Sequence, residues 1–231
     1  MATFGPPAPD AEPVAAPAFA TARLLILQRA LATLTHELGN MTSPVALVAD
    51  ALTVGATPAQ QASVAGTLRL VANSLRDSTA VCRILRGNLA PGALSPATFT
   101  DTSHWWSLCQ PFVADMLPDM ARVHANVAAT TLDTARYDAL TWSAVAAALL
   151  TATTRTPLTN LTVTGTANDA RPHLFELTFT TCAPKINSPA RATRELRHLL
   201  AWEVARAGGT LQVVNTASRL DLRITIAPTS G

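Results

Sequence analysis

Apolar side chains recur at alternating steps of three and four residues from Leu24 to Leu52. This heptad spacing lines one stripe of a long α-helix. The pattern stops at residues 55–58, and a second row with the same spacing runs from Val64 to Leu89. The two rows therefore predict two long helices joined by a short turn, which together form an antiparallel hairpin.

Each helix of this hairpin has one narrow apolar stripe, and a single hairpin cannot enclose both stripes alone. Pairing with a second copy into a four-helix bundle buries them, so the pattern predicts a homodimer. The alternative is that the hairpin packs against the rest of its own chain.

Beyond residues 90–92 the pattern changes to shorter segments that alternate between helical and strand-like periodicity. Helices are predicted around 103–117, 136–153 and 191–207, and strands around 122–130, 160–166, 174–181, 210–216 and 219–227. The fold class is therefore α+β, with a helical hairpin followed by an α/β sandwich domain. We assign residues 1–17 to a flexible Pro/Ala-rich tail, 18–92 to the hairpin and 93–231 to the α/β domain.

The composition excludes several classes of function. Only 14% of the residues are charged and the formal net charge is +2, which argues against a nucleic-acid partner. Cys82, Cys109 and Cys182 lie far apart and the histidines show no ligand spacing, so no metal site is predicted. No apolar run approaches the roughly 20 residues of a membrane span. A soluble protein in the reducing cytoplasm is the expectation.

The first predicted helix contains the stretch from His36 to Val45, which reads His-Glu-Leu-Gly-Asn-Met-Thr-Ser-Pro-Val. This stretch resembles the phosphoacceptor motif of sensor histidine kinases, which begins His-Glu-Leu-x-Asn. The resemblance includes the hairpin and the order of the segments after it, and so covers most of residues 20–228. It implies a dimerisation and histidine-phosphotransfer hairpin followed by a domain of the kinase ATP-binding type.

The heptad spacing places His36 independently of the family. Leu38 occupies an a position, so His36 lies at f, on the solvent side of the helix. A nitrogen that attacks a phosphoaspartate on another protein must be exposed, nucleophilic and rigidly held, and this position meets these needs. The alternative is an ordinary surface histidine.

The resemblance also implies roles for the neighbours of His36. Glu37 would accept a proton or hydrogen bond from the imidazole, and Asn40, one turn later, would orient water for dephosphorylating the receiver. Each of them also fits an ordinary polar surface residue. The expected docking surface for a receiver domain comprises Ala32, Thr33, Gly39, Asn40 and Ser43.

The second domain lacks the nucleotide-binding residues of the family. Thr151 stands where the family has the asparagine that binds magnesium, and Ala147 occupies the other polar position. Residues 180–186 lie where an Asp-x-Gly-x-Gly loop would bind adenine, and they lack both the acid and the glycines. Gly208 and Gly209 are interpreted as a helix C-cap. We therefore expect a degenerate ATPase-like domain with no bound cofactor.

These observations predict a histidine phosphotransferase of a bacterial two-component phosphorelay. His36 would carry the phosphoryl group between receiver-domain aspartates, and the receiver would supply its own Mg²⁺. One alternative is a pseudokinase scaffold or phosphatase that binds a response regulator. Another is an active kinase that binds ATP through substituted residues.

Overall fold

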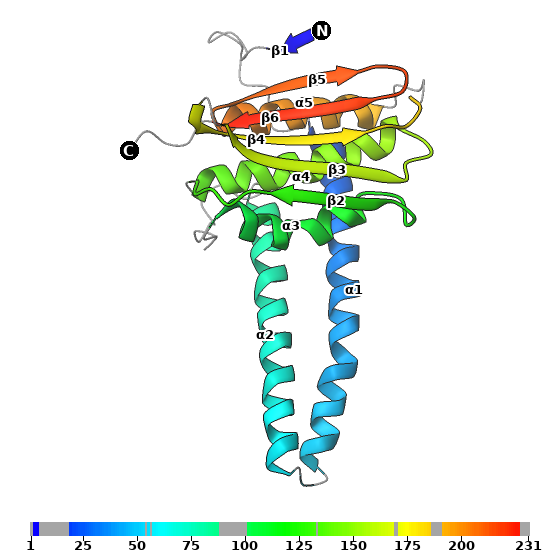
Figure 1. Cartoon of the computed structure of the whole chain (residues 1–231). Helices are drawn as coiled ribbons and strands as arrows, with labels where there is room; N and C mark the ends of the chain where they lie inside the picture. Colours follow the sequence, from blue (N-terminus) through cyan, green and yellow to red (C-terminus); the bar gives the residue numbers. More distant parts are fainter. Residues whose placement is uncertain are drawn as a thin grey trace.

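A long helical hairpin projects from a compact α/β domain (Figure 1). The computed structural model describes residues 2–4, 19–53, 55, 57–87, 101–132, 134–168, 171–185 and 191–226. The hairpin consists of α1 (Ala20–Thr53) and α2 (Pro58–Gly87). Gly55 lies in the connection with a φ of 85°, a left-handed conformation that suits glycine. The hairpin predicted from the heptad spacing is confirmed.

The α/β domain contains every predicted helix and strand within a few residues of its expected position. Its helices are α3 (Thr102–Asp115), α4 (Thr134–Thr154) and α5 (Arg191–Arg206). Its strands are β2 (Arg122–Val127), β3 (Asn160–Asn168), β4 (Arg171–Thr181), β5 (Gly209–Asn215) and β6 (Leu220–Ile226). The predicted fold of a hairpin followed by an α/β sandwich is confirmed.

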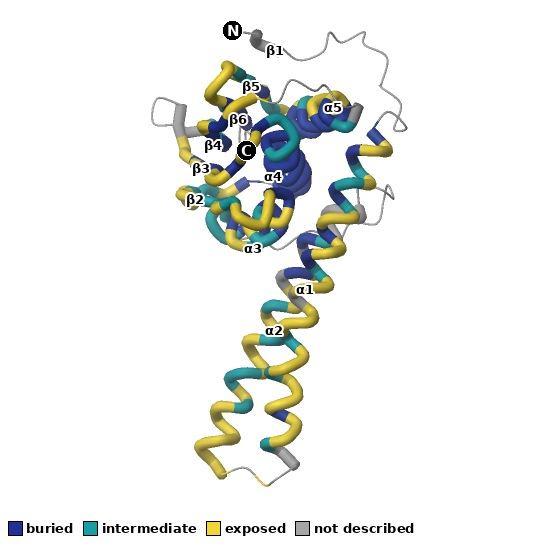
Figure 2. Tube along the Cα trace, turned by 90° about the vertical axis from the view of Figure 1, so that its right-hand side faces the viewer, coloured by how far each residue is buried: buried dark blue, intermediate teal, exposed yellow. Residues whose placement is uncertain are grey.

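The described strands form one sheet in the order β1-β5-β6-β4-β3-β2. β2 and β3 pair in parallel, and the other neighbours pair antiparallel. Buried residues alternate with more exposed ones along β6, because successive side chains point to opposite faces of a sheet. The helices lie on one face of the sheet (Figure 2), and the other face is open.

The N-terminal segment departs from the prediction of a flexible tail. Ala2–Phe4 form the short strand β1, which pairs antiparallel with β5. β5 would otherwise be an edge strand with free backbone groups, and Ala2–Phe4 contain no proline, so their amides can complete the ladder. The prediction is wrong for these three residues. Residues 5–18 lie outside the described part of the chain.

The core lies between the sheet and its helices. Phe175, Phe179 and Leu222 from the sheet belong to one buried cluster with Trp105 of α3 and Trp142 of α4. Every residue of α4 from Tyr137 to Thr151 is buried. This helix is therefore enclosed by the sheet and by the other helices.

The end of α5 confirms the predicted C-cap at Gly208, whereas Gly209 is the first residue of β5. The helix ends at Arg206, and Gly208 follows with a φ of 70°. A Cβ atom on Gly209 would lie 2.6 Å from the backbone oxygen of Thr225, so a larger residue could not start β5 at this separation.

The two halves of α1 have different surroundings. Phe19, Ala22, Ile26 and Ala30 are buried and belong to the same core cluster as the α/β domain. Farther along, exposed residues predominate on α1 and α2 (Figure 2). The hairpin therefore packs on its own chain at one end, as the alternative interpretation held, and leaves apolar side chains exposed at the other.

Candidate functional site

The imidazole of His36 is exposed on the surface of α1, as its f position predicts. It borders a shallow depression together with Ala32, Gly39 and Asn40. Nothing lies within 4 Å of the position that a Cβ atom on Gly39 would take. Ala32 and Gly39 add little bulk beside the ring, and Gln28, Leu31 and Thr35 complete the lining of the depression.

His36 also borders a second hollow of ≈ 460 Å³ on the side of the α/β domain. Its far wall is the connection between α3 and β2, residues 115–121, which we call the α3–β2 corner. Asp115 and Asp119 line this wall, and Arg29 lines the wall on α1. The histidine therefore lies on a ridge between two open surfaces, and one of them is shared with the second domain.

The other predicted site residues have different positions. Asn40 borders the same depression as His36, and Ser43 is exposed on the same helix but does not line that depression. The side chain of Glu37 lies outside the described residues. Thr33 is only 3% exposed, and its hydroxyl donates a hydrogen bond to the carbonyl of Arg29 over 3.1 Å.

The inclusion of Thr33 in the exposed docking surface is therefore wrong. The α/β domain covers the side of α1 that carries Ala22, Ile26, Ala30 and Thr33, whose spacing of three to four residues places them on one face. This packing was not visible in the heptad pattern.

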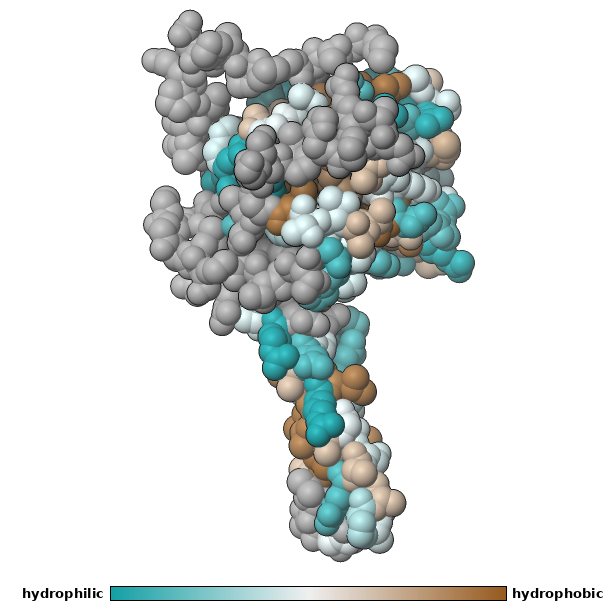
Figure 3. Space-filling view, turned by 60° about the vertical axis from the view of Figure 1, so that its left-hand side comes forward, coloured by the Kyte–Doolittle hydropathy of each residue, from teal (hydrophilic) through white to brown (hydrophobic). Residues whose placement is uncertain are grey.

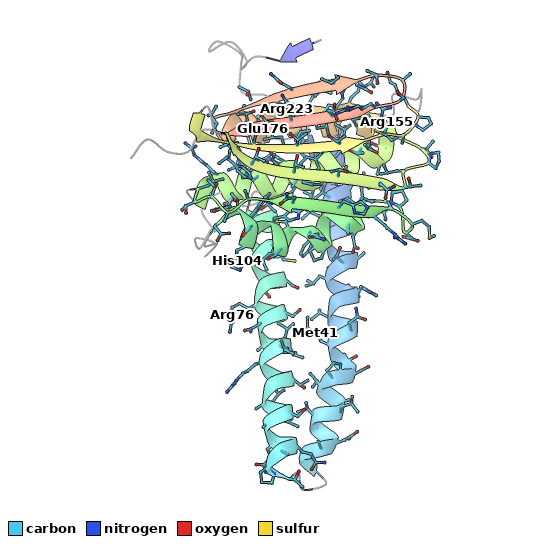
Figure 4. The ribbon with its side chains drawn as sticks, in the orientation of Figure 1. Met41, Arg76, His104, Arg155, Glu176 and Arg223 are labelled. Atoms are coloured by element: carbon cyan, nitrogen blue, oxygen red, sulfur yellow. The ribbon has the colours of Figure 1, made fainter. Side chains whose placement is uncertain are left out.

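The apolar residues of α1 at d positions and those at a positions have different surroundings. Val48, at a d position, is buried, and Met41, at another d position, is half-buried and points toward α2 (Figure 4). The a-position residues whose side chains are described remain exposed in the single chain: Leu24, Leu31, Leu38 and Val45 are 57, 63, 44 and 43% exposed. Apolar surface is visible on the hairpin in Figure 3. One side of the hairpin is thus unburied and apolar.

On α4, the two positions compared with magnesium-binding residues in the sequence are buried inside the protein. Thr151 and Ala147 on α4 are 1 and 0% exposed. The hydroxyl of Thr151 donates to the carbonyl of Ala147 over 2.8 Å, so its hydrogen is used within the helix. Neither residue offers an accessible oxygen ligand to a cation.

Arg155, just after α4, lies beside the segment that follows β4. Its buried guanidinium donates hydrogen bonds to the carbonyls of Ala183, Thr216, Ala217 and Arg219, at 2.7, 2.9, 3.3 and 2.6 Å. It also donates to the side-chain oxygen of Asn215. Burial lowers the pKa of Arg155 from its ordinary value.

These bonds tie the end of α4 to the segment after β4 and to the β5–β6 turn. Figure 4 shows Arg155 at the C-terminal end of α4. A cation in this position, with several carbonyls directed at it, acts as a clamp on the loops.

Arg23 joins the beginning of α1 to the α/β domain. Its guanidinium carbon lies 5.7 Å from the ring centroid of Trp142 and 5.4 Å from that of Trp202. Its Nη2 lies 3.7 Å from Oε1 of the fully buried Glu203. The backbone N–H of Ala22 donates to Oε2 of Glu195 over 3.2 Å, which satisfies one of the free amides of the first turn. We call this set of contacts the α1 latch.

The carboxyls beside the latch carry perturbed pKa values. Burial raises the pKa of Glu203, while Arg206 at 2.8 Å and Arg23 act in the opposite direction. Burial also raises the pKa of Asp138, against the attraction of Arg206. The latch therefore contains a charge that folding removes from water.

The described residues contain no group of three or more His, Cys, Asp or Glu side chains that could hold a metal ion. Within the same part of the chain, no helix is long and apolar enough to cross a membrane. His104 and His198 lie on different helices, α3 and α5.

The sequence indicated His36 and Asn40 but not the α3–β2 corner, Arg155 or the α1 latch. A short motif on a periodic helix is a local signal. The other features join residues that are far apart in the chain, as in the hydrogen bond from Arg155 to Arg219, which spans 64 positions. No composition or spacing signal marks such a pair.

The sequence matches no known family model and no curated protein. The fold is similar to those of solved structures of low sequence identity. Histidine kinase AdeS of Acinetobacter baumannii has a TM-score of 0.45 and 13% identity, with 84% of this chain and 98% of that chain covered. A structure described as a bacterial phosphotransferase has a TM-score of 0.47 and 12% identity, with coverages of 92 and 98%. The histidine kinase domain of the blue-light activated histidine kinase EL346 of Erythrobacter litoralis has a TM-score of 0.46 and 11% identity, with coverages of 80 and 95%.

Proposed function

We propose that this chain is a histidine phosphotransferase of a two-component phosphorelay, in which His36 carries the phosphoryl group between receiver-domain aspartates. The observation that carries the proposal is the exposed imidazole of His36, held on a continuous helix and bordered by two open surfaces. A rigid, accessible nucleophile is what transfer between two proteins requires.

The transfer is a nucleophilic displacement at phosphorus. The lone pair of the unprotonated ring nitrogen of His36 forms the N–P bond. The bond between phosphorus and the receiver's aspartyl oxygen breaks, and its electrons remain on the aspartate carboxylate. The other ring nitrogen keeps its proton, which Glu37 is placed in sequence to share. The reverse step returns the phosphoryl group to a second receiver.

The phosphoryl group would come from another protein and not from ATP. The helix expected to hold magnesium is buried, and the hydroxyl of Thr151 bonds to its own helix. Arg155 fills the space beside the segment that would bind adenine. Both observations support a domain that has kept its packing without a nucleotide. In this proposal Mg²⁺ is held by the receiver.

The exposed a positions of α1 support a homodimer as the acting form. A second hairpin placed against this row would bury Leu31, Leu38 and Val45 and complete a four-helix bundle. The f position of His36 would stay exposed in such a bundle.

The test is a labelling experiment with two phosphoryl donors. Wild type, His36→Gln and the control His198→Gln, which changes an exposed histidine of α5, are incubated with labelled ATP or with labelled phospho-receiver domains from the same genome. Label from a receiver alone, lost only in His36→Gln, is the expected result. Labelling from ATP would contradict the proposal, and so would the absence of label from every receiver.

A second candidate function is dephosphorylation of a receiver. It is favoured by the position of Asn40, which borders the same depression as His36 and could orient a water molecule. Substituting Asn40→Ala should then slow release of inorganic phosphate from the receiver without reducing transfer to His36. An equal loss of both would place Asn40 in docking instead.

A further inference from the structure

We infer that the α3–β2 corner is the second half of the receiver-docking surface, so that the α/β domain contacts the receiver together with α1. This inference rests on the proposed function and names a surface for the same partner. It gives the α/β domain a direct part in recognition in a chain where it holds no nucleotide.

A receiver bound at His36 would cover an area wider than the hollow beside it. A weak protein–protein contact covers up to about 600 Å² on each partner, which is a disc with a radius of roughly 14 Å. A hollow of ≈ 460 Å³ is only roughly 10 Å across if it is treated as a sphere of that volume. His36 and the corner border this same hollow, so a receiver centred on His36 reaches the corner unless it is displaced entirely toward the other side.

The surface of the corner carries carboxylates. Asp115 and Asp119 are exposed, and neither forms a salt bridge with a described residue. Met120, between them and β2, is 86% exposed. Exposed carboxylates beside an apolar side chain fit a partner surface that carries Lys or Arg around an apolar patch. The corner is thus complementary to a receiver with basic residues near its phosphorylated aspartate.

Buried side chains and a backbone hydrogen bond hold the corner in place. Leu117 and Met116 are buried, and the amide of Ala121 donates to the carbonyl of Pro118 over 2.8 Å. A further hollow, lined by Arg29, Asp119 and the end of α4, shares Arg29 and Asp119 with the first. The α1 latch fixes the same helix to α4 and α5. A surface made of two domains can recognise a partner only when the domains keep their relative positions.

The experiment compares two double variants that each remove two negative charges with little change in volume. One is Asp115→Asn with Asp119→Asn. The control is Glu176→Gln with Asp221→Asn, on β4 and β6, where Glu176 pairs with Arg223 on the open face of the sheet (Figure 4). Transfer is measured from the receiver domain that labels the wild type, phosphorylated with acetyl phosphate, at several salt concentrations. Phosphorylation of His36 by phosphoramidate reports on the histidine without a protein partner.

The corner variant should lose about tenfold in kcat/KM at low salt and should show a weaker dependence on salt, because steering charges act on association. The control variant and phosphoramidate labelling should remain at wild-type rates. Unchanged or faster transfer by the corner variant would overturn the inference while the proposed function stands. A parallel loss with phosphoramidate would also overturn it, since the carboxylates would then act on His36. Failure of the wild type to accept phosphoryl from any receiver would instead refute the proposed function.

Discussion

Arg155 is a buried cation whose hydrogen-bond partners in the described part of the chain are four carbonyls and one amide oxygen, with no carboxylate among them. Replacing it with Met should lower the free energy of unfolding by roughly 3–5 kcal/mol, because several buried acceptors would lose their donors. Arg223→Met is the matched control, since Arg223 is half exposed and pairs with Glu176 at the surface; it should cost about 0–1 kcal/mol. Urea unfolding of both variants measures the difference. Similar losses in both would contradict the clamp.

Glu203 predicts a dependence of stability on pH. Its pKa in the unfolded chain is close to the ordinary value of 4.5, and burial raises the folded value. Between these two values the folded chain holds a proton that the unfolded chain has lost, so stability falls as the pH rises through this window. Glu203→Gln should lose this part of the slope, and Asp138, whose pKa is also raised, should keep a smaller part. Denaturant unfolding at several pH values tests this, and an unchanged slope would contradict it.

At the scale of single residues the sequence was informative where the signal is local. The f position of His36 follows from the heptad spacing alone, and the exposed imidazole agrees with it. Thr33 was misplaced because its burial depends on a domain that begins about seventy residues later in the chain. Arg155 and Glu203 were missed because partners such as Arg219 and Arg23 lie far from them in the chain.

At the scale of elements, the α1 latch connects the beginning of the hairpin to the α/β domain. Arg23→Met removes a guanidinium that lies between two tryptophans and beside a buried carboxylate, and should cost roughly 2–4 kcal/mol. Hydrogen exchange should rise in the first ten residues of α1 more than in α2. Arg29→Met, an exposed arginine on the same helix, is the control. Equal protection in wild type and Arg23→Met would show that the latch does not hold the helix.

The helices and strands were predictable because each shows a regular spacing of apolar residues and ends at a residue that breaks this spacing. The burial alternation of β6 and the glycine after α5 are examples of such signals. Strand β1 was not predictable, because its three residues show no alternation of apolar and polar side chains. They form a strand because they pair with the edge of β5. The pairing of β2 with β3 in parallel likewise depends on the crossover through α4.

At the scale of the whole molecule, the exposed a positions of α1 call for a partner. Leu38→Glu together with Val45→Glu should convert a dimer into a monomer, because charges would replace apolar contacts at the bundle interface. Leu47→Glu is the control: Leu47 is 70% exposed but lies at a c position, outside the row. Sedimentation analysis gives the mass. A dimer that persists in the double variant, or is lost equally in the control, would contradict this interface.

In the proposed relay the phosphoryl group rests on His36 during transfer. A rapid-mixing time course with phospho-receiver measures this, and the phosphorylated residue is located by mass spectrometry of the intact chain and its fragments. Phosphate should leave the receiver at the rate at which it appears on His36, and a second receiver should then remove it. Release as inorganic phosphate with His36 never modified would contradict a relay through His36.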